Sequence, residues 1–354
     1  MTDTTAATAT ATTATAASGT AATNTDAWAD RTVLVTGAEG FIGSTLVDLL
    51  VARGARVRAL VHYKPYAERG HLAGHLGSDR VEMLAGDVRD AGRVSDAVAG
   101  CDTVFHLAAL IGIPYSYDSP GAYVHTNVVG TQNVLEAARR HGVRRVLHTS
   151  TSEVYGTALS APIGEDHPLQ PQSPYSASKI GADMMALSFH HAFELPVTVV
   201  RPFNTYGPRQ SARAVIPAIL AQLHSGVREL RMGSLTPTRD FTYVTDTAAG
   251  FLALADCDRA VGEAVNLGTG QEISIGDLAG ALIAASGRTD VEITVDPARL
   301  RPAGSEVHRL LSDNARARTW SGWQPEVPLE EGLAKTSAWV AEHLHLFDPK
   351  RYAV

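Results

Sequence analysis

The chain reads Thr36-Gly37-Ala38-Glu39-Gly40-Phe41-Ile42-Gly43 where a β-branched run ends and a helical pattern begins, and this motif determines the expected architecture. The first glycine permits a tight turn, the second lets backbone approach a pyrophosphate, and the third allows close packing of helix on strand. The helix N-terminus then faces the anion. The motif predicts a dinucleotide-binding loop whose cofactor contacts are Gly37, Gly40, Phe41, Ile42 and Gly43.

Around this loop, short β-branched runs alternate with helical patterns, which is typical of βαβ units and a parallel sheet. We expect strands at 32–36, 56–61, 81–84, 103–106, 145–149 and 197–201. We expect helices at 41–53, 93–98, 122–140 and 175–193. The predicted fold class is therefore α/β, a Rossmann-type doubly wound parallel sheet that binds ligands at the carboxyl ends of its strands.

The pattern changes after Asn204, where Pro and Gly separate shorter segments. We expect helices at 214–225, 245–255 and 274–285, and a strand at 264–267 that returns to the main sheet. This part is predicted to be a smaller, mixed α/β lid over the substrate. The predicted organisation is a disordered Ala/Thr-rich tail at 1–29, a dinucleotide-binding domain at 30–203 and a substrate-binding domain at 204–345.

Composition narrows the class of protein. With 354 residues and 45% hydrophobic content, the chain is long enough for a sizeable core. Its 30 Lys+Arg against 37 Asp+Glu give a net charge of −7, and without a basic run we expect no nucleic-acid or membrane partner. Cys101 and Cys257 lie far apart, so we expect neither a disulfide nor a metal site. No apolar run approaches the roughly 20 residues that cross a bilayer, so a soluble, cytoplasmic protein is expected.

A possible proton-transfer pair lies downstream, in Tyr175-Ser-Ala-Ser-Lys179. Four residues on a helix separate groups that share one face. An ammonium beside a phenol favours the phenolate, which predicts a lowered pKa for Tyr175 and a base for alcohol oxidation. The alternative is an ordinary exposed Tyr/Lys pair.

The end of the second strand would normally distinguish NAD from NADP by an acidic residue that binds the adenosine ribose. Here the strand ends in Leu60-Val61-His62-Tyr63-Lys64, without a carboxylate. His62, Lys64 or Arg69 could meet a 2′-phosphate or could be solvated surface charge, so the choice stays open. After the third strand, Asp87 and the adjoining Val88 are placed to contact adenine, although Asp87 could instead cap the next helix.

The fifth expected strand runs into Thr149-Ser-Thr-Ser-Glu-Val-Tyr-Gly156. Together with the glycine loop, His106-Leu-Ala-Ala109 and the Tyr175/Lys179 pair, this motif resembles the extended short-chain dehydrogenase/reductase family, in particular its nucleotide-sugar epimerases, dehydratases and decarboxylases. The resemblance covers residues 31–340. It implies a tightly bound, recycled NAD or NADP and further cofactor contacts at Leu107, Ala108, Ala109, Tyr175 and Lys179.

The resemblance also implies catalytic roles. Thr151 would bind the sugar O4, Tyr175 would remove its proton, and Lys179 would hold the nicotinamide ribose. Hydride leaves C4, the resulting ketone acidifies the C5 proton, and Glu153 is the candidate that abstracts it before water leaves C6. Glu153 could instead form a salt bridge with an arginine.

Ser152 departs from the glucose-type dehydratases, which carry Asp-Glu after the threonine. A serine hydroxyl is a weak acid, so protonation at C6 would fall to Glu153 or to a water. The Ser-Glu pair resembles GDP-mannose 4,6-dehydratases and legionaminic-type NDP-N-acetylglucosamine 4,6-dehydratases. The latter resemblance is carried by Ile113–Tyr117, Thr149–Gly156, Pro168–Lys179 and Arg201–Gln210.

A 4,6-dehydratase acting on an NDP-N-acetylglucosamine is thus expected. The alternatives are a UDP-glucuronate decarboxylase, a 4-epimerase, and a non-catalytic dinucleotide-binding protein. Planar guanidinium groups suit a sugar-nucleotide diphosphate. By resemblance the substrate-binding candidates are Asn204, Arg209, Arg213, Arg239 and Arg301, while Tyr115 and Tyr117 would line the sugar pocket or pack the lid.

The helices expected at 122–140 and 175–193 carry apolar residues on more than one face. One face covers the sheet. Because this family often pairs these helices in a four-helix bundle, we expect a homodimer.

Overall fold

The computed structural model describes residues 1, 25–29, 31–63 and 70–348. A seven-stranded parallel sheet forms its centre, with the strand order β11-β6-β5-β4-β1-β2-β3. The order reverses between β1 and β4, which is where such sheets open a ligand crevice. The strands are β1 Thr32–Thr36, β2 Arg56–Val61, β3 Val81–Ala85, β4 Thr103–His106, β5 Arg145–Thr149, β6 Val197–Pro202 and β11 Ala264–Leu267.

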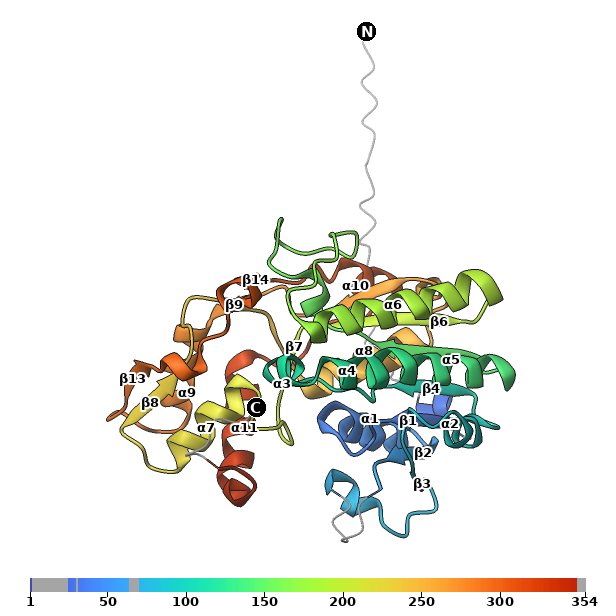
Figure 1. Cartoon of the computed structure of the whole chain (residues 1–354), viewed down its shortest axis with the longest axis horizontal. Coiled ribbons are helices and arrows are strands. Elements are labelled where there is room, and N and C mark those ends of the chain that lie inside the picture. The colour runs from blue at the N-terminus through green and yellow to red at the C-terminus, as the bar shows by residue number, and fades with distance from the viewer. Residues whose placement is uncertain (2–24, 30, 64–69, 349–354) are drawn as a thin grey trace.

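Helices cover both faces of this sheet (Figure 1). On β1, Val33 and Val35 join one core cluster and Leu34 joins the other, so successive side chains are buried on opposite faces. One face is covered by α1 (Phe41–Ala52) and α8 (Val244–Ala255). The other is covered by α2 (Ala91–Val98), α5 (Gly130–Arg140) and α6 (Pro174–Phe193).

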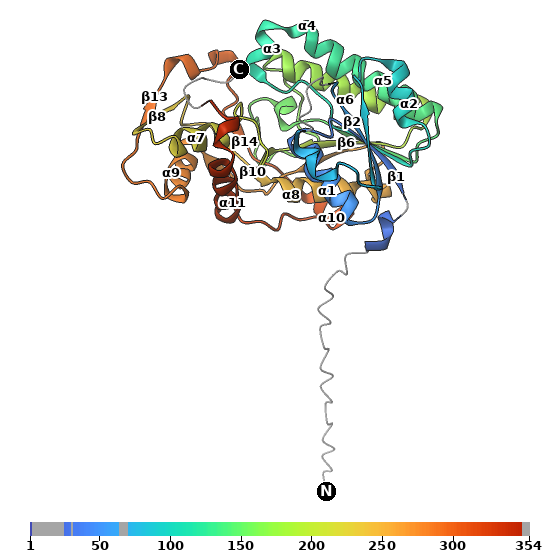
Figure 2. The ribbon, with the colours of Figure 1, turned by 90° about the horizontal axis from the view of Figure 1, so that it is seen from below.

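The lid lies beside the strand ends and has its own core (Figure 2). Its main helices are α7 (Val215–His224), α9 (Ile275–Ala285) and α11 (Leu329–Glu342). Three small sheets complete it: β8 (Glu229–Met232) with β13 (Glu292–Val295), β7 (Asn204–Tyr206) with β10 (Phe241–Tyr243), and β9 (Thr238–Arg239) between β12 (Ile273–Ser274) and β14 (Arg309–Leu310).

Shorter elements connect these parts. The remaining α-helices are α3 (Ile113–Asp118), α4 (Pro120–Tyr123) and α10 (Ala315–Ser321), and Val124–Val129 is a π-helical turn, η3. The 3-10 turns are η1 Thr25–Trp28, η2 Gly70–His75, η4 Ser152–Tyr155, η5 Asp258–Ala260, η6 Pro297–Arg299, η7 Ala303–Ser305 and η8 Leu344–Leu346.

The predicted fold class is confirmed, and the main strands lie within one residue of their expected bounds. The strand at 264–267 does return to the main sheet, beside β6. The helix expected at 122–140 is instead α4, the π turn and α5 in succession. Helix α11 was not predicted, because Thr336 and Ser337 share its buried face and weaken the apolar periodicity.

The predicted tail extends too far. Thr25–Trp28 forms a 3-10 turn, and Trp28 is only 1% exposed, with its ring 5.8 Å from that of Phe105 and 4.7 Å from the Arg31 guanidinium. A single aromatic residue has no periodicity that sequence reasoning could detect. Residues 2–24 of the predicted tail lie outside the described residues.

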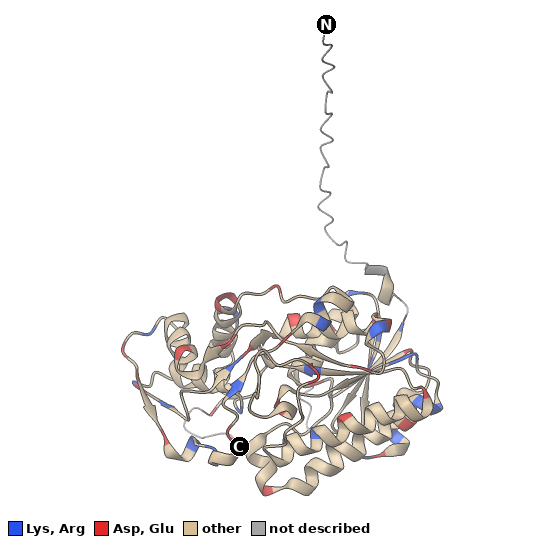
Figure 3. Cartoon of the chain, turned by 90° about the horizontal axis from the view of Figure 1, so that it is seen from above, with Lys and Arg blue, Asp and Glu red and all other residues tan. Residues whose placement is uncertain are grey.

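Positions of Lys and Arg are interspersed with those of Asp and Glu along the ribbon (Figure 3). Within the described ranges, no helix combines the length and the apolar character needed to span a membrane.

Candidate active site

The glycine loop leaves room for backbone but not for side chains. Gly37 has φ +66°, and a Cβ there would lie 2.9 Å from the Ala108 nitrogen. A Cβ on Gly43 would lie 2.3 Å from the Gly37 oxygen. No side chain caps the N-terminus of α1, which leaves its first N–H groups for an anion. These observations fit a dinucleotide pyrophosphate at the turn, and the structure brings the loop against Leu107 and Ala108 as expected.

A buried relay fixes the two strand ends beneath this loop. The Thr36 hydroxyl accepts hydrogen bonds from the N–H groups of Leu107 and Ala108, both at 3.1 Å, so its own proton points to His106 Nδ1 at 2.8 Å. His106 Nε2 then donates to Thr131 Oγ1 at 3.0 Å. Burial holds the pKa of His106 well below its ordinary value, which agrees with a neutral ring. The relay joins β1 to β4 at the floor of the cofactor crevice.

A carboxylate does lie at the end of β2, but the strand does not supply it. Glu39, in the glycine loop, accepts a hydrogen bond from the His62 backbone N–H at 3.1 Å. The sequence pattern predicts this acid only at the end of β2 itself, so it did not reveal Glu39, which the glycine loop brings to the same place. The side chain of His62 is exposed, and Lys64 and Arg69 lie outside the described residues.

Asp87 is held by its neighbour Arg89, whose Nε donates to both carboxylate oxygens at 3.0 Å. This hydrogen bonding lowers the pKa of Asp87. The alternative that Asp87 caps the next helix is wrong, because Asp90 caps α2 by accepting from the Arg93 N–H. Val88 packs in the core, and the contacts of both residues with a cofactor stay predictions.

The proton-transfer pair is buried, not exposed. Ser173 and Ser176 form a capping box at the start of α6, and Tyr175 lies between them in the first helical turn. The Lys179 Nζ donates to the Thr149 carbonyl at 2.6 Å. The Thr151 side chain lies close enough to the Tyr175 phenol to act on its pKa, so the end of β5 and helix α6 come together here.

The expected lowering of the Tyr175 pKa is wrong. Burial raises that pKa, the Thr151 hydrogen bond acts against the rise, and the charge of Glu153 adds to it. Burial also lowers the pKa of Lys179, to about 8. The four-residue spacing predicts that Tyr175 and Lys179 lie close together. It does not predict their desolvation, which is the largest cause of both pKa shifts.

Beyond Thr151 a cavity of about 240 Å³ opens between the strand ends and the lid. Glu153 and Asn204 line it, and their roles toward substrate stay predictions. Five arginines line it as well: Arg213, Arg231, Arg239, Arg299 and Arg301. Arg231 and Arg299 belong to no motif recognised in the sequence, and only the folded lid reveals them.

The cavity arginines differ in their partners. Arg239 is buried, which lowers its pKa, and its Nη2 lies 3.6 Å from Glu306. The Nη1 of Arg301 is buried and has no hydrogen-bond partner in the described part of the chain. Arg209 is not among the cavity residues, and its Nη1 binds Asp48 on α1 at 2.7 Å, so its contact with substrate stays a prediction. Its positive φ of 74° belongs to a turn that the sequence did not predict.

The two tyrosines after β4 do not line this cavity. The Tyr117 hydroxyl lies 2.5 Å from Ser305 Oγ, so Tyr117 contacts the lid. Packing against the lid was one of the two expected alternatives for this residue. The ring of Tyr115 lies 6.1 Å from that of Tyr123, which in turn lies 6.2 Å from that of Tyr175. Tyr115 therefore belongs to an aromatic row that leads to the phenol.

Asn127, on the π turn, is a residue that sequence reasoning missed. Its side chain accepts from the Leu110 N–H at 2.9 Å and donates to the Leu110 carbonyl at 3.0 Å and to Ser178 Oγ at 2.9 Å. It thereby ties the segment after β4 to the helix beside Lys179. The described residues contain no group of three His, Cys, Asp or Glu side chains that could hold a metal ion.

Residues 34–336 match the GDP-mannose 4,6 dehydratase family, and the chain belongs to this family of enzymes. A dTDP-glucose 4,6-dehydratase of Streptomyces antibioticus is 37% identical over 322 residues, which cover 90% of this chain and 94% of the relative. A UDP-glucose 4-epimerase of Mycolicibacterium smegmatis is 40% identical over 311 residues, 86% of this chain and 96% of the relative.

Solved structures of both kinds of enzyme, dehydratase and epimerase, are similar to this chain. The dTDP-glucose 4,6-dehydratase DesIV from Streptomyces venezuelae, with NAD and TYD bound, has a TM-score of 0.81 at 33% identity and covers 90% of this chain and 100% of its own. The UDP-glucuronic acid 4-epimerase from Bacillus cereus, in complex with UDP-glucuronic acid and NAD, has a TM-score of 0.81 at 29% identity, over 88% of this chain and 99% of its own. The predicted membership in the extended short-chain dehydrogenase/reductase enzymes is confirmed, and both dehydratases and epimerases are similar to the chain.

Proposed function

We propose that the chain is an NAD-dependent nucleotide-sugar 4,6-dehydratase that acts on an NDP-N-acetylglucosamine. One observation carries the dehydratase assignment: Glu153 lines the cavity, its backbone N–H donates to the Thr151 hydroxyl at 3.2 Å, and its charge acts on the Tyr175 phenol. A 4,6-elimination needs a base at C5 close to the group that oxidises C4, whereas simple epimerisation needs none. The dTDP-glucose 4,6-dehydratases among the relatives support this assignment.

NAD, when bound, supplies the acceptor and later the donor of hydride. The chain supplies the rest. Thr151 binds the sugar O4, and Tyr175 takes the O4 proton as the C4 hydrogen leaves with its electron pair. Glu153 removes the C5 proton and delivers it to the departing C6 hydroxyl, which leaves as water. Hydride then returns to C6, and the proton that Tyr175 took from O4 reaches C5 by way of Glu153, which gives the 4-keto-6-deoxy sugar.

The diphosphate of the substrate fits the arginine-lined side of the cavity. Arg239 and Arg301 offer guanidinium forks, which match phosphate geometry. Arg239 is buried and the Nη1 of Arg301 is buried, so salt only weakly screens their attraction for an anion.

A 4-epimerase is the second candidate, because the Mycolicibacterium enzyme is 40% identical and Ser152 replaces the acid of glucose-type dehydratases. A purely cofactor-binding role is less well supported, since such a protein has no use for the convergent Thr151, Tyr175 and Lys179.

The test is to incubate the purified chain and NAD with UDP-, dTDP-, GDP- and CDP-sugars and to weigh the products, with Tyr175→Phe as the inactive control. Loss of one water supports the dehydratase. An unchanged mass with altered sugar configuration would establish the epimerase instead, and loss of carbon dioxide a decarboxylase. A higher kcat/KM for UDP-N-acetylglucosamine than for UDP-glucose supports the proposed sugar, and the reverse order contradicts it.

We also propose a homodimer through the outer face of α4, the π turn, α5 and α6. Val134, Leu135 and Phe189 are buried in the chain's own core, whereas Val124 and Met184 stay exposed on the neighbouring face. Light scattering should give twice the chain mass for the parent. A monomeric parent would contradict the proposal, and Met184→Lys should shift a dimer towards the monomer.

A further inference from the structure

Asp183 continues the face of α6 that carries the proton-transfer pair. It follows Lys179 by four residues, as Lys179 follows Tyr175, so all three side chains lie along one side of the helix. Asp183 is 0% exposed and Lys179 3%. A buried carboxylate is retained only where it has strong partners.

Two partners of Asp183, His148 and Ser150, lie on either side of Thr149, the last residue of β5. Asp183 Oδ2 accepts from Ser150 Oγ at 2.7 Å, and Oδ1 lies 3.3 Å from His148 Nε2. Between them lies Thr149, whose carbonyl accepts the Lys179 ammonium at 2.6 Å. The carboxylate thus fixes the strand end to which Lys179 is bound.

The same contact reaches the phenol. Ser150 directly precedes Thr151, whose hydroxyl meets Tyr175. Asp183 therefore joins the helix that carries Tyr175 and Lys179 to the strand end that carries Thr151. Loss of this link would let the two hydroxyls separate, and errors of about 1 Å in such geometry reduce rates strongly.

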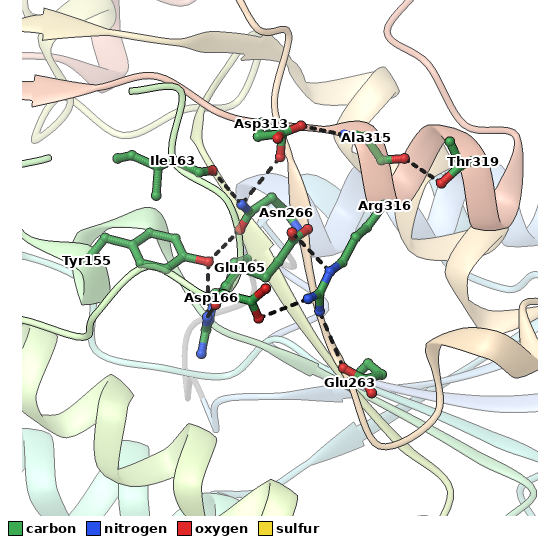
Figure 4. Close-up of polar contacts among 11 residues, drawn as sticks. Tyr155, Ile163, Glu165, Asp166, Glu263, Asn266, Asp313, Ala315, Arg316 and Thr319 are labelled. Atoms are coloured by element: carbon green, nitrogen blue, oxygen red, sulfur yellow. Dashed lines mark hydrogen bonds and ion pairs between the residues drawn. The ribbon is translucent and has the colours of Figure 1, made fainter. Parts of the chain in front are cut away.

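Charge gives Asp183 a second role. Arg201 on β6 also reaches it, with Nε at 3.2 Å, but Arg201 is held elsewhere too: its Nη1 donates to the Tyr155 hydroxyl at 3.0 Å. Tyr155 donates to Asn266, and Asn266 leads through Glu165 to Arg316 near the surface (Figure 4). This network anchors Arg201 without Asp183.

Lys179 has no such anchor, since the Thr149 carbonyl is its one hydrogen-bond partner among the described residues. Burial lowers its pKa to about 8, and the Asp183 charge acts against that fall. The other titratable or charged groups around this cluster are His106, His148, Arg201, Tyr123, Glu153 and Tyr175. Burial lowers the pKa of both histidines, and at His148 the hydrogen bond to Asp183 and the Asp183 charge act against that fall.

We propose that Asp183 is a positioning residue of the reaction: it holds the end of β5 against α6 and supplies the negative charge that retains the Lys179 ammonium beside Tyr175. The inference rests on the proposed oxidation at C4. It holds equally for a dehydratase and for an epimerase, because both begin with that step.

The test is the pH dependence of kcat for Asp183→Asn, which keeps the shape and a hydrogen-bond acceptor but removes the charge. Lys179 must be protonated, so activity falls as pH rises through its pKa. Without Asp183 that pKa falls further, and the alkaline limb should move down by about one pH unit. With a parent pKa of about 8, the ratio of rates at pH 8.5 and pH 6.5 should then drop about sixfold, a change that a merely structural role would not produce.

Two variants control the experiment. Asp183→Glu keeps the charge and should lower kcat while leaving the alkaline limb in place, and it carries the test if Asp183→Asn does not fold. Asp246→Asn removes a buried carboxylate from α8, where it accepts from the N–H groups of Glu326 and Val327, and should lower only the Tm.

An alkaline limb of Asp183→Asn that coincides with that of the parent overturns the proposal, as does a limb moved equally by Asp183→Glu. Failure of the proposed function shows separately, as a parent that converts none of the sugar nucleotides.

Discussion

Replacing Arg301 by glutamine should weaken binding of a nucleoside diphosphate without destabilising the lid. The Arg301 Nη1 is buried and has no hydrogen-bond partner among the described residues, so in the free protein this donor stabilises nothing. A hydrogen bond between a charged group and its partner contributes about 1.5–3 kcal/mol. Because each 1.4 kcal/mol is about tenfold in affinity, the Kd should rise about 10- to 150-fold.

Titration calorimetry with UDP and dTDP measures this change directly, without turnover. The matched control is Arg309→Gln, since Arg309 is an exposed lid arginine whose Nη2 is paired with Glu272 at 2.5 Å. Arg309→Gln should bind both nucleotides as the parent does. The Tm of Arg301→Gln should equal or exceed that of the parent, because an incompletely paired charge has been removed from a buried site.

The reasoning is refuted if Arg301→Gln binds UDP and dTDP with the parent's Kd, or if Arg309→Gln loses as much affinity. In either case the arginine-lined side of the cavity would not hold the diphosphate.

Three further predictions concern the reaction and the fold. Tyr175→Phe should lower kcat by at least 10²- to 10⁴-fold, the usual contribution of a positioned acid or base, while calorimetry still finds NAD bound; parent-like turnover would remove Tyr175 from the mechanism. Glu153→Gln should stop exchange of the C5 hydrogen in heavy water, as followed by mass spectrometry, and exchange at the parent rate would identify another base. Trp28→Ala should lower the free energy of unfolding by about 3–5 kcal/mol in urea denaturation, with a smaller loss for Trp28→Phe, and equal stability of Trp28→Ala would contradict its role in the core.

The architecture could be predicted because the strands of the main sheet and the helices that cover it are each indicated by a local sequence pattern. The β1 run and the glycine loop, for example, combine a β-branched segment with a turn that admits no side chain at Gly37 or Gly43. Such signals need no knowledge of distant residues. The same holds for the spacing of Tyr175 and Lys179.

What the sequence did not predict depends on tertiary contact. Asp183, Asn127 and Glu39 become informative only when their partners, from separate elements, are seen around them. Desolvation of Tyr175 is a property of the packed site and not of the motif, which is why its pKa moves against the expectation. Trp28 precedes the first periodic segment and is recognised only by its contact with Phe105.

The return of β11 to the main sheet has a practical consequence for anyone building chimaeras. Since β11 pairs with β6, dividing the chain after β6 would leave β6 as an unpaired edge strand. It would also remove α8, which covers one face of the sheet. The halves are not exchangeable modules. Transplanting the specificity-bearing part from a relative requires grafting the flanking pieces while leaving the native 244–267 portion in the recipient.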